Sequence, residues 1–295
     1  MNSSELGARL ARRPLLLDGG LGSLLIAAGL EPGRDPAWWN LEHPERVEAV
    51  HRGYVGAGSD IVHTNTFGAN PVKLRSAGLG ERCREVNARA VEIARSACGG
   101  AALVAGDIGP SGLTLPPVGS ASVAELRESF AEQAGALAAA GADLLSIETM
   151  FDLREALAAL AAARATGLAV LASMTFEARK RGFFTIMGDA LVPSLTALAD
   201  AGADAVGCNC SVASPVMRAM IEEAAAAVRA PLVAQPNAGQ PRATANGIIY
   251  DAPVEEFARD LAAMVTAGAR LVGGCCGTDA SFIRAARAAL AGTAH

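Results

Sequence analysis

Short apolar runs alternate along this chain with longer stretches rich in alanine, leucine, arginine and glutamate. Continuous apolar runs of this length are typical of strands that are buried on both faces, as in a parallel sheet whose strands are joined by helices. We therefore expect repeated strand-helix units. The eight runs cover residues 15–20, 60–67, 102–110, 143–150, 168–176, 204–211, 231–239 and 270–277.

Helix signals fill the gaps between these runs. The stretches 44–56, 123–140, 152–166 and 253–267 predict helices, and Ser122, Asp152 and Asp251 are candidate N-terminal caps of the last three. Four of the strands follow a similar Ala-Gly phrase, in which the glycine allows a helix to end and turn into a strand. These glycines are Gly58, Gly141, Gly202 and Gly268.

Eight strand-helix units in one chain predict a TIM (β/α)8 barrel, which we expect to form a single α/β domain over residues 1–295. A doubly wound sheet is the alternative, and it would need a nucleotide-binding fingerprint in its first turn. The glycine-rich segment 18–22 does not match that fingerprint. The pattern therefore favours the barrel.

Composition narrows the class of protein further. Hydrophobic residues make up 51% and charged residues 19%, which is enough apolar surface for a large core and excludes extensive disorder. The net charge of −5 disfavours a nucleic-acid partner. Charged residues and glycines interrupt the apolar stretches, so we expect no membrane partner and no secretion signal. Six cysteines are too few for a disulfide scaffold, and we expect a cytoplasmic protein.

Cysteines stand at two of the expected strand ends. Cys210 ends the sixth strand, and Cys275 and Cys276 end the eighth. Barrel enzymes build their sites at these ends, so the three thiols would meet at one mouth. Three thiolates suit zinc, provided that the chain bends at the adjacent pair, as the neighbouring glycines permit. We interpret the remaining cysteines as small buried apolar residues. They are Cys83, Cys98 and Cys208.

Seven segments in this order resemble the zinc-dependent homocysteine S-methyltransferases, over residues 14–290. Within that family they are most similar to the homocysteine-binding module of cobalamin-dependent methionine synthase, with kinship to the betaine and S-methylmethionine enzymes. Any one motif alone would carry little information, whereas the ordered set is specific. The segments are DGGLG at 18–22, TNTFG at 64–68, GDIGP at 106–110, ET at 148–149, NC at 209–210, PNAG at 236–239 and GGCCGT at 273–278.

The resemblance implies a metal site and a substrate site. It implies zinc bound by Cys210, Cys275 and Cys276, with Asn237 as a fourth ligand before substrate arrives. It also implies that Asp18 and Glu148 act as catalytic residues that hold homocysteine. The implied substrate-binding residues are Asp18, Gly19, Asn65, Thr66 and Glu148.

The implied reaction transfers a methyl group to the zinc-bound thiolate of homocysteine and gives methionine. A free thiol has a pKa of ~8.5, so a metal is needed to supply the thiolate at neutral pH. The alternatives are methyl transfer to another thiol, demethylation of a betaine or sulfonium donor, and a silent subunit that presents a thiol to a corrinoid partner. A Schiff-base enzyme is disfavoured because neither Lys73 nor Lys180 ends a strand.

The methyl donor stays open. Residues 175–188 depart from the methionine synthase pattern, and this chain contains no corrinoid or folate module. The partner would therefore be a small methyl donor or a separate methyl-corrinoid protein. Trp38 and Trp39 either cover one end of the barrel or recognise a methyl-onium group. We expect His63 to be a hydrogen-bonded residue rather than a metal ligand.

Overall fold

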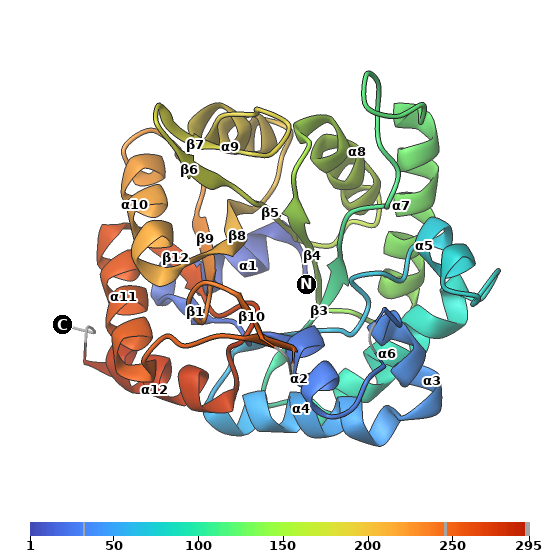
Figure 1. The fold of residues 1–295 in the computed structure, drawn as a ribbon, viewed down its shortest axis with the longest axis horizontal. Coiled ribbons are helices and arrows are strands. Elements are labelled where there is room, and N and C mark those ends of the chain that lie inside the picture. The colour runs from blue at the N-terminus through green and yellow to red at the C-terminus, as the bar shows by residue number, and fades with distance from the viewer. Residues whose placement is uncertain (32, 245–246, 293–295) are drawn as a thin grey trace.

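The computed structural model describes residues 1–31, 33–244 and 247–292, and eight of its strands form one parallel sheet that curves into a ring (Figure 1). Neighbouring strands follow the order β1-β12-β9-β8-β5-β4-β3-β2. This is the strand order of a nearly closed (β/α)8 barrel, so the predicted TIM barrel is confirmed. The strands are β1 (Leu15–Leu16), β2 (Ile61–His63), β3 (Leu103–Ile108), β4 (Leu144–Met150), β5 (Val170–Met174), β8 (Ala205–Ala213), β9 (Leu232–Asn237) and β12 (Ala269–Val272).

Helices surround the sheet and follow the predicted pattern. The four predicted helices are all present. The glycines of the four Ala-Gly phrases all have a positive φ, from 92° at Gly141 to 123° at Gly268. The larger helices are α4 (Pro44–Ala57), α6 (Cys83–Cys98), α7 (Val123–Ala139), α8 (Leu153–Arg164), α9 (Leu191–Asp200), α10 (Ser214–Ala225), α11 (Val254–Ala267) and α12 (Ala280–Ala291). Shorter elements are α2 (Leu21–Ala27), η1 (Pro36–Trp38), α3 (Trp39–Glu42) and α5 (Pro71–Ser76), with hairpins β6 (Glu177–Arg179)–β7 (Gly182–Phe184) and β10 (Arg242–Thr244)–β11 (Gly247–Ile249).

Two of the three predicted helix caps are confirmed. Ser122 accepts the Glu125 amide at the start of α7, and Asp152 accepts the Arg154 amide at the start of α8. The predicted cap at Asp251 is wrong. Pro253 precedes α11 in an extended conformation, so the helix begins too late for Asp251 to reach its first amides. Asp251 instead forms an ion pair with Arg242 at 3.0 Å.

The amino-terminal helix α1 (Ser3–Arg12) closes one end of the barrel. Its Leu6 and Leu10 are buried in one cluster with side chains from all eight strands of the ring. The Met1 ammonium also donates to the Asp143 carbonyl at 2.6 Å. Since this helix contacts the strands near their amino-terminal ends, the opposite mouth is left for a functional site. No helix in the described part of the chain is long and apolar enough to span a bilayer.

A single seam interrupts the ring, because β1 and β2 do not pair as strands. The Asp60 amide donates to the Leu16 carbonyl at 2.7 Å, and the Asp60 carboxylate accepts the Leu16 amide at 2.8 Å. The same carboxylate binds Arg13 at 2.8 Å and Arg287 at 2.6 Å. Side-chain hydrogen bonds thus take the place of a strand ladder at this junction.

Candidate metal and substrate site

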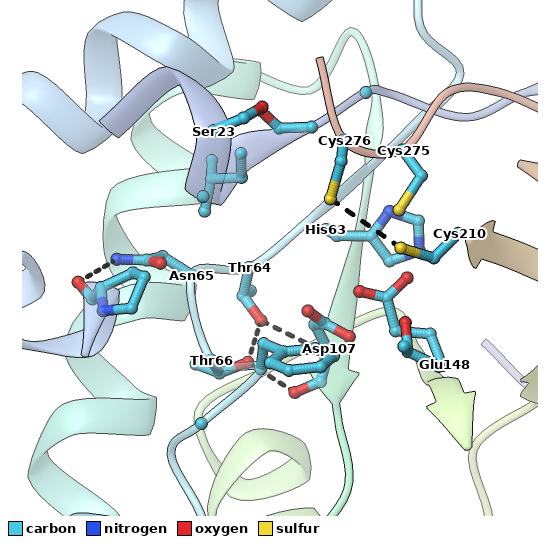
Figure 2. Close-up of a pocket in the computed structure, with 18 of the residues that line it drawn as sticks. Ser23, His63, Thr64, Asn65, Thr66, Asp107, Glu148, Cys210, Cys275 and Cys276 are labelled. Carbon is cyan, nitrogen blue, oxygen red and sulfur yellow. Dashed lines mark hydrogen bonds between the residues drawn. The ribbon is translucent and has the colours of Figure 1, made fainter. Parts of the chain in front are cut away.

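Three cysteines meet at the carboxyl-terminal mouth of the barrel (Figure 2). The sulfur atoms of Cys210, Cys275 and Cys276 all lie within 4.8 Å of one another. The Sγ atoms of Cys210 and Cys276 are 3.8 Å apart, which is too long for a disulfide. The expected convergence of these thiols from distant positions in the sequence is therefore present in the fold.

Local backbone bends aim the sulfurs toward one another. β12 ends at Val272, so the adjacent cysteines lie in a turn rather than in a strand, where they would point to opposite faces. The Cys275 amide donates to the Pro236 carbonyl at 2.9 Å, which fixes this turn against the end of β9. Cys210 itself has a φ of 61°, a strained conformation for a residue with a side chain and one that is common at functional sites.

The sulfur geometry fits a tetrahedral metal. Zinc–sulfur bonds of about 2.3 Å at tetrahedral angles place two sulfurs about 3.8 Å apart, which is the Cys210–Cys276 separation. Hydrogen bonds from Cys210 and Cys275, with a further one from Tyr250, lower the pKa of Cys276. Hydrogen bonds to its neighbours raise the pKa of Cys275. These hydrogen bonds thus favour a single thiolate in the cluster, at Cys276. A divalent cation would offset the repulsion that arises when all three cysteines are deprotonated.

Asn237 occupies the last position of β9, and its side chain is buried. Its Oδ1 atom has no hydrogen-bond partner within the described ranges, although buried carbonyl oxygens are normally satisfied. An unpartnered amide oxygen on a strand end that contacts the cysteine turn fits the predicted role of fourth ligand. That role stays a prediction, because Asn237 is absent from the wall of the adjacent cavity.

A cavity of about 220 Å³ opens directly onto the cysteines. This volume is below the ~300–1,000 Å³ of pockets for drug-sized ligands and suits a smaller metabolite. Of the residues predicted for the site, Asp18 and Asn237 are missing from the wall. The predicted residues that do line it are Gly19, Asn65, Thr66, Glu148, Cys210, Cys275 and Cys276.

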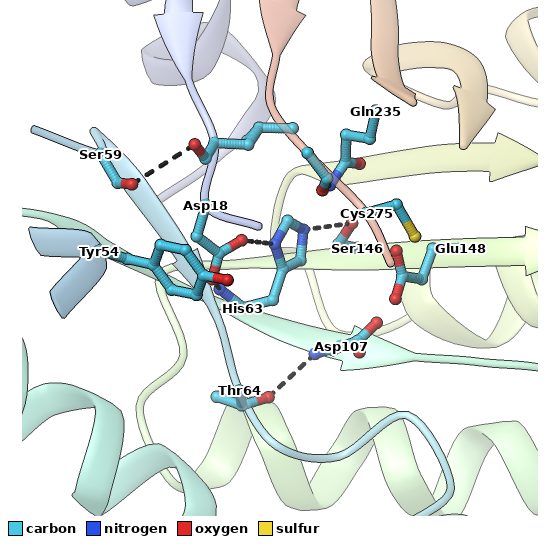
Figure 3. Close-up of polar contacts among 12 residues, drawn as sticks. Asp18, Tyr54, Ser59, His63, Thr64, Asp107, Ser146, Glu148, Gln235 and Cys275 are labelled. Carbon is cyan, nitrogen blue, oxygen red and sulfur yellow. Dashed lines mark hydrogen bonds and ion pairs between the residues drawn. The ribbon is translucent and has the colours of Figure 1, made fainter. Parts of the chain in front are cut away.

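Asp18 lies behind the cavity and contacts His63 (Figure 3). One oxygen is 2.6 Å from His63 Nδ1, and the other accepts the His63 amide at 2.8 Å. The other ring nitrogen lies 3.1 Å from Ser146 Oγ. Burial lowers the pKa of His63, but the charge and hydrogen bond of Asp18 outweigh it and raise the pKa to about 10. The expectation of a hydrogen-bonded histidine is confirmed, and its cationic ring forms part of the cavity wall.

The carboxyls of Asp107, which is buried, and Glu148, which is half-buried, both line the cavity and lie near each other (Figure 2). Burial raises the pKa of both groups, and the Glu148 charge raises that of Asp107 further, so the pair retains a proton. Glu148 also accepts Asn209 Nδ2 at 2.9 Å. No role was predicted for Asp107, although its position near the end of β3 is a signal that the sequence contains.

The side chains of Asn65 and Thr66 form hydrogen bonds that hold the cavity wall in place. Asn65 Nδ2 donates to the Pro36 carbonyl at 2.8 Å and to Asn40 Oδ1 at 2.9 Å. Thr66 Oγ1 donates to the Asp107 carbonyl at 2.7 Å. Both residues therefore position the loop that contains them. Both also line the cavity.

Other singled-out residues lie away from the cysteines. Trp39 is buried in a cluster with Leu25, and Trp38 lies outside the cavity, where its Nε1 donates to the Ala77 carbonyl at 2.8 Å. Neither tryptophan lines the cavity, and neither does any residue of the hairpin β6–β7. The cysteines expected to be structural are buried as predicted. They are Cys83, Cys98 and Cys208.

The fold and the site together define a barrel protein with a thiol cluster suited to a metal, set beside a small polar cavity. The chain belongs to the homocysteine S-methyltransferase family, whose sequence pattern matches residues 15–290.

Two mycobacterial methionine synthases are among its relatives. The protein of Mycobacterium tuberculosis is 32% identical over 96% of this chain, and that of Mycobacterium leprae is 31% identical over 98%. The chain spans about 25% of the length of each. Among solved structures, the metallated form of the homocysteine methyltransferase MmuM from Escherichia coli is 29% identical, with a TM-score of 0.80, over 95% of this chain and 98% of that one.

Proposed function

We propose that this protein is a zinc-dependent methyltransferase that transfers a methyl group to homocysteine and gives methionine. The observation that carries the proposal is the cluster of Cys210, Cys275 and Cys276 opening onto a cavity with paired carboxyls. Relatives of known type support it, because they include methionine synthases and a metallated homocysteine methyltransferase.

The three cysteines would hold the zinc ion, with Asn237 as fourth ligand until substrate replaces it. When bound, zinc would supply homocysteine in its thiolate form at neutral pH. Three protein thiolates would leave the zinc site with a net negative charge, which would keep electron density on the substrate sulfur. The strained backbone at Cys210 and the turn at Cys275 hold the sulfurs in this arrangement in advance of binding.

The polar wall would hold the amino-acid end of homocysteine. The Glu148 and Asp107 pair offers oxygens to the substrate ammonium, which would displace the proton that the two carboxyls share. The cationic His63 ring and the backbone amides near Gly19 would face the substrate carboxylate. Asp18 would act through His63, as a positioning residue.

Two features of the reaction belong to the proposal as alternatives. The acceptor could be a different thiol, and the methyl group could come from a betaine, a sulfonium compound or a separate methyl-corrinoid protein. We also propose a cytoplasmic location, because all six cysteines are unpaired in the structure and a reducing compartment would keep them so.

Metal analysis followed by an activity assay tests the proposal. We expect about one zinc per chain in the wild type and loss of zinc in Cys275→Ser, with Cys98→Ser as a control on a buried helical cysteine. The same samples would then be assayed for methionine from homocysteine with S-methylmethionine, betaine or methylcobalamin. Freshly reduced wild-type protein that lacks zinc, or zinc-loaded protein that makes no methionine with any donor, would contradict the proposed function.

A further inference from the structure

The side chain of Asn209 joins two strands of the ring that are not neighbours. Asn209 is buried and lies in β8, whereas Thr149 lies in β4, and β5 separates the two strands. The Thr149 amide donates to Asn209 Oδ1 at 2.7 Å, and Asn209 Nδ2 donates to Thr149 Oγ1 at 2.8 Å. Alternate strands of a (β/α)8 barrel contribute side chains to one interior layer, so this contact skips β5.

The same amide group also holds the carboxylate of Glu148. Asn209 Nδ2 donates to Glu148 Oε2 at 2.9 Å. Two adjacent residues of β4 therefore use both hydrogens of Nδ2 and one lone pair of Oδ1. Rotating the amide by half a turn would set Nδ2 against the Thr149 amide, donor against donor, so only one orientation satisfies these contacts. Asn209 thereby fixes one oxygen of Glu148, a residue of the cavity wall.

Both strands leave their regular ladders at this contact. The register of β4 with β5 shifts between Ile147 and Met150, on either side of Glu148 and Thr149. The register of β8 with β9 shifts directly after Asn209. Irregularities of this kind redirect side chains and are frequent beside active sites.

Backbone strain is concentrated in the same place. In the described part of the chain, three residues other than glycine have a positive φ, and they are Thr149 at 58°, Cys210 at 61° and Ser211 at 61°. Residues with a side chain keep this conformation only where their surroundings enforce it. Asn209 directly precedes the strained pair and binds the amide of the third residue, Thr149. The backbone that aims the Cys210 sulfur is thus anchored to β4.

We propose that Asn209 is a positioning residue that ties Cys210 in the metal cluster to Glu148 in the substrate wall. The inference rests on the proposed function, and it assigns one side chain to both reactive ends of homocysteine, the thiol and the ammonium. Asn209 does not line the cavity, so it acts through Cys210 and Glu148. Groups that a shared residue holds in place beforehand lose less freedom when metal and substrate bind.

Zinc affinity and ligand affinity, both measured without a methyl donor, test the proposal. Competition with a chromogenic chelator gives the zinc affinity. Homocysteine and 4-mercaptobutanoate, which lacks only the ammonium, would then be titrated calorimetrically into protein saturated with zinc. We expect Asn209→Ala to weaken zinc binding roughly tenfold, as loss of a supporting contact does. It should also reduce the preference for homocysteine over 4-mercaptobutanoate roughly tenfold.

Variants of Glu148 assign the second effect to its cause. Glu148→Gln should lose the same preference and keep its zinc affinity within about twofold, because Glu148 belongs to only one end of the site. Asn209→Ala in the Glu148→Gln background should lower the preference no further, since Asn209 acts on the ammonium through Glu148. The zinc affinity of this double variant should still fall roughly tenfold.

Two more variants guard against a general loss of structure. Asn87→Ala is the matched control, because Asn87 is also buried and its Nδ2 donates to the carbonyls of Ala69 at 2.8 Å and Cys83 at 2.7 Å. It should change neither quantity. Thr149→Val removes only one hydroxyl partner of Asn209 and should give smaller losses of both kinds, about threefold each. It carries the test if Asn209→Ala does not fold.

The proposal requires both quantities to fall together. Unchanged zinc affinity or an unchanged preference in Asn209→Ala would overturn it, as would losses of the same size in Asn87→Ala. Failure of the proposed function appears instead in the wild type, as a lack of zinc or of any preference for homocysteine. Failure of this inference alone appears in the variants of a wild type that has both.

Discussion

Asp18 contacts His63 through both of its carboxylate oxygens, one at 2.6 Å from the ring Nδ1 and the other at 2.8 Å from the backbone amide. Asp18 follows β1 and His63 ends β2, so this contact crosses the one junction of the barrel that lacks a strand ladder. The carboxylate that the sequence assigns to substrate is therefore already engaged with the protein.

Asp18→Asn should lower the pKa of the His63 ring by one unit or more, because an amide removes the negative charge that opposes the cost of burial. Nitrogen-15 chemical shifts of the ring, followed through a pH titration, measure this directly. Ser146→Ala removes only a neutral partner of the other ring nitrogen and should have a much smaller effect. An unchanged His63 pKa in Asp18→Asn would contradict the assigned contact.

Stability should fall on the alkaline side because of the same pair. The folded-state pKa of His63, about 10, is higher than its unfolded value of 6.5, so its stabilising contribution is complete below pH 6.5. That contribution is lost as the pH rises toward 10. The unfolding free energies of the wild type and His63→Gln, measured on reduced, metal-free protein, should therefore converge between these pH values. A difference that stays constant across the range would show that the ring is neutral in the folded protein.

Asn237→Ala should weaken zinc binding roughly tenfold, as the loss of one ligand among four or of a supporting contact does in zinc proteins. Competition with a chromogenic chelator measures the affinity without reference to turnover. Asn87→Ala is the control, because it removes another buried side-chain amide whose Oδ1 has no partner. Asn87 lies on α6, and its substitution should leave zinc binding unchanged. Equal zinc affinity in the wild type and Asn237→Ala would exclude Asn237 from the metal site.

Two glycine substitutions should have opposite effects on stability. A Cβ atom at Gly207 in β8 would lie 2.0 Å from the Val233 carbonyl oxygen of the neighbouring strand, so Gly207→Ala must separate β8 from β9. We expect a loss of about 1–3 kcal/mol. Gly135 lies within α7, and apart from its chain neighbours and the nearby backbone of its own helix no atom lies inside 4 Å of its ideal Cβ, so Gly135→Ala should add about 0.5–1 kcal/mol. Urea unfolding compares the two, and a stable Gly207→Ala protein would disprove the packing argument.

The barrel and its cysteine cluster were predictable because they depend on one-dimensional signals. Apolar runs mark buried strands, and the carboxyl ends of parallel strands meet at one mouth, so Cys210 and the pair at 275–276 had to approach each other. The bend that the adjacent cysteines require was foreseen from the surrounding glycines, and the turn after β12 supplies it.

The orientation of the acidic residues was not predictable in the same way. Asp18 faces His63 rather than the cavity because the His63 ring lies 2.6 Å from its carboxylate. The spacing of residues in the sequence does not encode such a contact. Asp107 gains its role only from the nearby charge of Glu148, and Tyr250 only from its contact with Cys276. Such pairings join residues from separate strand-helix units, so they emerge only when the ring closes.

The barrel closes between β1 and β2 without a strand ladder, so side-chain contacts hold this junction together. Asp60 is the central residue of this junction. Its carboxylate accepts the Leu16 amide and forms ion pairs with Arg13, near the start of the chain, and with Arg287 of α12. His63 connects this junction to the cavity, because its amide donates to Asp18 across the junction and His63 also lines the cavity wall. Amide hydrogen exchange at Leu16 should consequently slow when a ligand fills the cavity, because a bound ligand would also hold the junction between β1 and β2 closed.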